Sequence, residues 1–147
     1  MRGKTMPLFT LSFLLIVVST VLYHVSQKSI APNAHPVLSL LVTYGLAVAG
    51  TLLLLPFFPV GPPLAQAWRQ LNWASATVGL SIVGVELGFL LAYRAGWRIS
   101  MGSAAANAAV AVLLVPTGLL FFGERPSWSN VLGAALCLAG LLLVVTR

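Results

Sequence analysis

One glutamate, Glu86, lies in the middle of a long apolar run, in the stretch SIVGVELGFLLAYR. If the run is a helix bounded by Trp73 and Arg94, Glu86 lies within about 5 Å of its midpoint. A charge buried at the centre of a bilayer costs at least about 2.5 kcal/mol, so an acid at this depth is a candidate functional group. Such a carboxyl is expected to take up and release a proton near neutral pH, as an ion-coupled carrier requires.

Polar residues with helical spacing share the face of Glu86. Ser75 and Tyr93 are 11 and 7 residues away, within about 20° of Glu86 around a helix. The opposite face carries Gly84 and Gly88, whose spacing allows a neighbouring helix to pack closely. We therefore expect the acid to face polar groups. The competing interpretation is a structural glutamate, protonated or hydrogen-bonded to a hydroxyl on a neighbouring helix.

Other apolar runs carry polar stripes that are expected to line the same cavity. Each stripe could instead serve hydrogen bonding between helices alone. Taken together with the glutamate, they favour a central cavity in which aromatic faces contact a cation. Tyr44 lies off the stripe of its own run and is the weaker candidate. The candidates for lining the cavity are Ser75, Tyr93, Asn107, Tyr44, Tyr23 and Ser19.

The elements that must position these residues are membrane helices. Of the 147 residues, 59% are hydrophobic and only 7% are charged, which predicts an all-α integral membrane protein. Five runs approach the roughly 20 apolar residues that cross a hydrocarbon core. Segment 63–72 is too polar to cross and is expected to lie on the surface as a short amphipathic helix. We predict one five-helix domain over residues 1–147, with spans at 7–25, 37–58, 73–93, 100–122 and 130–145.

The composition also excludes several classes of function. The net charge is +6, but the eight basic residues are scattered singly, which argues against a nucleic-acid surface. The sequence shows no Cys/His metal set, no nucleophile with an evident base and no phosphate-binding glycine loop. We therefore predict no metal, no cofactor and no enzymatic activity.

Basic residues are expected in equal number on the two sides of the membrane. Under the positive-inside rule such a chain can insert in both orientations, and identical chains could then pair antiparallel. The alternative is that one loop dominates the orientation. The four residues on the N-terminal side are Arg2, Lys4, Arg69 and Arg125, and the four on the opposite side are Lys28, Arg94, Arg98 and Arg147.

Nearly the whole chain resembles a known repeat, most clearly from Tyr93 onward and least clearly before Pro36. The stretch FFGERPSWSNVLGAALCLAGLLLVV resembles the closing signature of the EamA-type repeat of the drug/metabolite transporter superfamily. The upstream stretch AYRAGWRISMGSAAANAAVAVLLVPTGLLFF resembles the preceding helix, including its Pro116. The resemblance implies half of a transporter with two inverted five-helix repeats, completed by an antiparallel homodimer or by a homologous half-transporter. The related small multidrug resistance proteins carry their glutamate in the first helix, so the role of Glu86 rests on its burial alone.

Near the C-terminus, the GERP loop is expected to be a solvated turn containing Glu124, with Ser127 or Ser129 capping the last helix. Small residues of that helix, Gly133 and Gly140, are expected to pack within the bundle or at the dimer seam.

Together these features predict a transporter in a bacterial inner membrane that exchanges protons for a small organic solute by alternating access. The acid favours a cationic solute, while amino acids and other metabolites stay open. The alternatives are a facilitator without proton coupling and a non-transporting subunit of a larger membrane complex.

Overall fold

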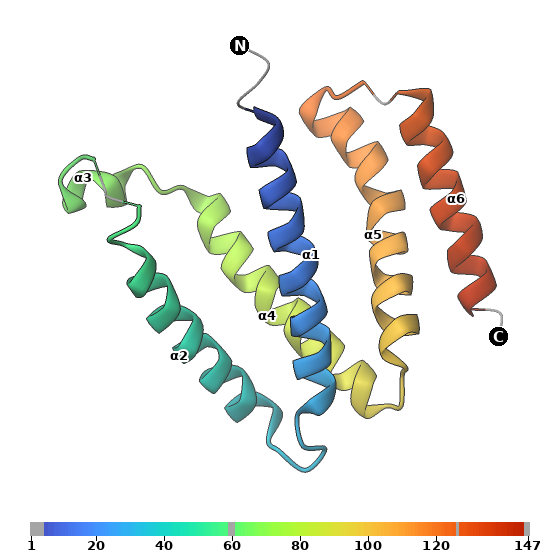
Figure 1. Cartoon of the computed structure of the whole chain (residues 1–147), viewed down its shortest axis with the longest axis horizontal. Coiled ribbons are helices and arrows are strands. Elements are labelled where there is room, and N and C mark those ends of the chain that lie inside the picture. The colour runs from blue at the N-terminus through green and yellow to red at the C-terminus, as the bar shows by residue number, and fades with distance from the viewer. Residues whose placement is uncertain (1–4, 59–60, 126, 146–147) are drawn as a thin grey trace. The chain divides into compact units, whose positions relative to one another are not determined.

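The computed structural model describes residues 5–58, 61–125 and 127–145, and these ranges are predominantly helical (Figure 1). Arg2, Lys4 and Arg147, which enter the charge count, lie outside the described residues. The helices are α1 (Thr5–Ser29), α2 (Pro36–Leu54), α3 (Leu64–Arg69), α4 (Trp73–Arg94), α5 (Ile99–Phe122) and α6 (Trp128–Val145).

Four of these helices, α1, α2, α4 and α5, are long and apolar enough to cross a membrane. Helix α6 is also apolar but shorter, and α3 is a six-residue helix within the predicted surface segment. The predicted class, an all-helical membrane protein, is therefore confirmed. The described chain packs as two compact units, Ser26–Arg94 and the remainder, so that α1 contributes to both. Each unit is described by itself.

In the unit Ser26–Arg94, α2 and α4 pack against each other. Helix α2 begins at Pro36, because a proline at the first helical position loses no hydrogen bond. It ends at Leu54, four residues before the predicted limit of 58, because Pro56 has no N–H to donate to the carbonyl of Leu52. The buried aliphatic residues of this unit are Leu40 of α2 and Leu90 of α4.

In the other unit, α5 and α6 lie side by side (Figure 1). Helix α5 continues through Pro116 and ends at Gly123, which adopts a left-handed conformation with φ 62°. Helix α6 begins at Trp128, because the Ser127 hydroxyl accepts a hydrogen bond from the Asn130 N–H at 3.3 Å. Of the two serines expected to cap this helix, Ser127 is the one that does so. The cap places the start of α6 two residues before the predicted limit of 130.

The small-residue faces are open. A Cβ atom placed on Gly84, Gly88, Gly133 or Gly140 would meet no atom within 4 Å. The described part of the chain packs nothing closely against these glycines, and their expected role in helix packing remains a prediction.

Candidate functional site

Helix α4 buries one narrow face, and Glu86 is part of it. The buried residues are Glu86, Leu90 and Tyr93, which are spaced as neighbours on one side of a helix. Their exposed fractions are 8%, 1% and 4%. Leu90 shields the acid on one side, whereas Ile82, one turn away in the other direction, is 44% exposed. Glu86 and Tyr93 therefore share a buried face.

The end of α1 contacts α4 at the position of the acid. The Gln27 amide Nε2 donates a hydrogen bond to the backbone carbonyl of Glu86 at 3.2 Å, and Gln27 is only 6% exposed. That carbonyl belongs to a helix, so the amide provides an additional bond rather than replacing a helical one. A buried amide is thus bonded to the backbone of the buried acid, although the two residues are separated by 59 positions.

Tyr44 belongs to α2, the helix that packs against α4, the helix of Glu86. Its hydroxyl oxygen is buried, and within the described ranges it has no hydrogen-bond partner. Leaving such a group unpaired costs about 1–3 kcal/mol, so a bound water or solute at this place would be favourable. The weaker of the aromatic candidates therefore has an unsatisfied buried hydroxyl on the helix next to α4.

The C-terminal end of α4 is held by cationic side chains. The Lys28 Nζ donates to the Tyr93 carbonyl at 3.1 Å and lies 5.6 Å from the centre of the Tyr93 ring. Phe89 stacks on the same ring at 5.9 Å. The Arg94 Nη2 donates to the Ala34 carbonyl at 2.7 Å. A lysine of the chain itself thus lies over the Tyr93 ring, and a contact of Tyr93 with a cationic solute remains a prediction.

Ser75 lies apart from this cluster. It is exposed near the start of α4, 11 residues from Glu86, which is about 16 Å along a helix. Its expected place on a solute path remains a prediction.

The other unit contains a hollow of about 400 Å³ between α1 and α5. Four polar residues line it, together with the aliphatic Ile16, Val17 and Val21. Asn107, a predicted cavity residue, is one of the four. The full polar lining is Thr20, His24, Ser103 and Asn107.

Three of these lining residues, Thr20, His24 and Ser103, are not among the six named candidates, although Ser103 belongs to the polar stripe of Asn107, and Thr20 and His24 lie beside that of Tyr23 and Ser19. The available signal was the pair of four-residue spacings, 20 to 24 and 103 to 107, each of which puts two polar groups on one helix face. Tyr23 and Ser19 do not line this hollow. The Tyr23 ring instead packs edge-on against the His24 ring, with 5.1 Å between centroids.

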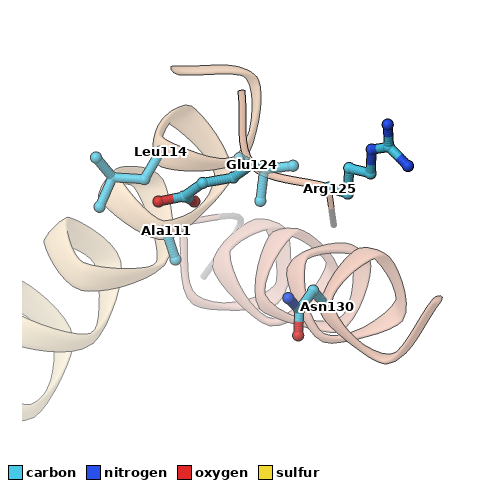
Figure 2. A pocket seen from close by; sticks show the side chains of 6 residues that line it. Ala111, Leu114, Glu124, Arg125 and Asn130 are labelled. Carbon is cyan, nitrogen blue, oxygen red and sulfur yellow. The ribbon is translucent and has the colours of Figure 1, made fainter. Parts of the chain in front are cut away.

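A second hollow of this unit, of about 250 Å³, lies at the corner between α5 and α6 (Figure 2). The Glu124 side chain folds back over α5, whereas Arg125 points away from it (Figure 2). Gly118 leaves the room for this carboxylate, because a Cβ atom there would lie 2.6 Å from its Oε2. Glu124 and Arg125 are both exposed, as expected of a solvated turn.

Among the residues that the structure describes, no three His, Cys, Asp or Glu side chains are grouped so as to hold a metal ion. A comparison with curated proteins and one with solved structures gave no match. The model of the EamA-like transporter family matches residues 5–146, nearly the whole length. The match therefore confirms the resemblance seen in the sequence, including its weaker part in the first helices. The chain belongs to the EamA-like transporter family.

Proposed function

We propose that this membrane transporter exchanges protons for a small organic solute, and that Glu86 binds the proton and the solute in turn. The observation that carries the proposal is the burial of Glu86 in the middle of the apolar helix α4. An unpaired carboxylate there is costly. An acid that alternates between a protonated form and a form paired with a cationic solute avoids that cost. The Gln27 amide, bonded to the Glu86 backbone, and the unpartnered Tyr44 hydroxyl of the adjacent helix α2 are the polar groups that this unit offers near the acid.

We further propose that two copies pair antiparallel in a bacterial inner membrane and alternate access around their two glutamates. The family match covers the chain once, and the resemblance to a single repeat leaves an inverted second repeat to be supplied. The equal numbers of basic residues favour insertion in both orientations. The open glycine face of α4 offers a surface for close helix contact. A homologous half-transporter is the alternative partner.

The test is proton release from the purified protein in detergent, under weak buffering. A panel of organic cations, amino acids and metabolites is titrated into the wild type, Glu86→Gln and Glu124→Gln. The chain has only two acidic residues, so Glu124→Gln is a matched control with the same loss of charge. We expect at least one compound to release protons from the wild type and from Glu124→Gln, and none to do so from Glu86→Gln.

Other outcomes separate the alternatives. Solute binding without proton release in the wild type would contradict coupling and favour a facilitator. Proton release that persists in Glu86→Gln would show that the released proton comes from a group other than Glu86. A folded protein that binds no compound, and that is isolated only with a different membrane protein, would favour a non-transporting subunit.

A further inference from the structure

The hollow between α1 and α5 has polar groups on both of its walls. Helix α1 contributes Thr20 and His24, and helix α5 contributes Ser103 and Asn107. Each pair is four residues apart, so its members lie one turn above each other on the same helix face. Polar groups on facing walls of a hollow between two apolar helices can bind a polar partner together.

The charge of this hollow cannot be negative. The chain has two acidic residues, Glu86 and Glu124, and neither lines it. His24 is the one titratable residue of the lining, so the hollow is neutral or positive at any pH. An ammonium group placed there would lose its hydration and find no counter-charge. The hollow therefore selects against cations, in contrast to the region of Glu86.

The lining is also rich in hydrogen-bond donors. The Asn107 amide offers two N–H donors and the Thr20 hydroxyl offers one, and neither side chain has a hydrogen-bond partner within the described ranges. The Ser103 hydroxyl already donates to the Ile99 carbonyl at 2.8 Å. Its oxygen can still accept a bond. Free donors without a nearby acid match a group that only accepts hydrogen bonds.

We propose that this hollow binds the carboxylate of a small aliphatic acid through Asn107, Thr20 and His24. Bonds from donors to a carboxylate are charge-assisted and stronger than those between neutral groups. The aliphatic residues Ile16 and Val17 contact the hydrocarbon part of the acid. The volume of about 400 Å³ lies within the range of small-molecule sites. The proposal does not depend on proton exchange at Glu86.

The test uses the two histidines of the chain as reporters. Protein labelled with 15N at histidine has imidazole signals from His24, which lines the hollow, and from His35, which is exposed and belongs to the other unit. His24→Gln assigns them. The probes are 4-methylpentanoate and 4-methylpentylamine, which share a carbon skeleton and differ in charge. We expect saturable shifts of His24 with the acid, an unchanged His35, and no saturable shift with the amine.

Two variants test the contacts. Asn107→Leu is expected to raise the Kd for 4-methylpentanoate about tenfold or more, since it removes hydrogen bonds to a charged group. Asn130→Leu makes the same change outside this hollow and is expected to leave the Kd unchanged. Thr20→Val removes one hydroxyl with little change of volume and is expected to raise the Kd severalfold.

The proposal is overturned if the amine shifts His24 as the acid does, if both histidines shift together, or if no saturable shift occurs. It is also overturned if Asn107→Leu and Thr20→Val both bind the acid as the wild type does. Glu86→Gln is expected to keep the His24 shifts. Binding of the acid at His24, without proton release by any solute, would therefore support this site and contradict the proposed exchange. Proton release that depends on Glu86, without acid binding at His24, would support the exchange and contradict this site.

Discussion

At the scale of single residues, the burial of Glu86 depends on a few neighbours. Leu90 is almost fully buried and covers one side, and the Gln27 amide holds the backbone carbonyl of the acid itself. Tyr44 adds a buried hydroxyl that has no hydrogen-bond partner in the described part of the chain. A buried acid with one incompletely satisfied polar neighbour is expected to bind a further polar group.

Removal of the Tyr44 hydroxyl can distinguish a structural role of this group from a functional one. Tyr44→Phe removes a buried hydroxyl that bonds to nothing in the described chain, so we expect the unfolding temperature in detergent to stay equal or rise. If the hydroxyl contacts the solute beside Glu86, the solute concentration that half-saturates proton release should increase about fivefold to tenfold. Thermal unfolding and proton release measured on the same preparation check both. A clear fall in the unfolding temperature would contradict this assignment.

The acid of the candidate site could be predicted from sequence, but most of its surroundings could not. Glu86 stands out because a charge in an apolar run is costly, and Tyr93 follows from helical spacing. Gln27 is brought to Glu86 by tertiary packing across 59 residues, which no local pattern indicates. His24 and Asn107 were each noticeable as polar residues in apolar runs. That they line one hollow depends on how α1 packs against α5.

At the scale of helices, the ends follow from local chemistry more closely than from hydropathy. Pro56 ends α2 early, and Ser127 starts α6 early. Helix α1 continues to Ser29, four residues past the predicted limit of 25, because Gln27 and Lys28 bond to α4. Apolar runs therefore predict that a helix exists. Caps, prolines and tertiary bonds determine where it ends.

The end of α5 gives a test of this local chemistry. Gly123 has a left-handed backbone with φ 62°, so Gly123→Ala is expected to destabilise the protein by about 1 kcal/mol. Gly45, inside α2, has no atom within 4 Å of where a Cβ would lie, so Gly45→Ala should be neutral or stabilising by up to about 1 kcal/mol. Thermal unfolding of both variants in one detergent checks that Gly123→Ala lowers the unfolding temperature and that Gly45→Ala does not. Equal shifts in the same direction would contradict the cap.

At the scale of the whole molecule, few charges determine the orientation in the membrane. The eight basic residues are counted as four on each side of the membrane, so the loss of one gives the other side the larger number. Lys28 and Arg94 also make tertiary bonds, so their substitution would disturb packing as well. Arg69 on α3 and Arg98 before α5 are exposed and on opposite sides of the count, which makes them a matched pair.

Arg98→Gln leaves four basic residues against three, so the N-terminal side should become predominantly cytoplasmic. If α6 also crosses the membrane and makes a fifth span, a C-terminal fusion would then lie outside, where alkaline phosphatase is active and a green fluorescent reporter is not. Arg69→Gln should have the opposite effect, and the wild type should show both activities. A wild type active with one reporter only would contradict dual insertion. If both substitutions also left that pattern unchanged, another signal would set the orientation, and antiparallel pairing of identical chains would be contradicted.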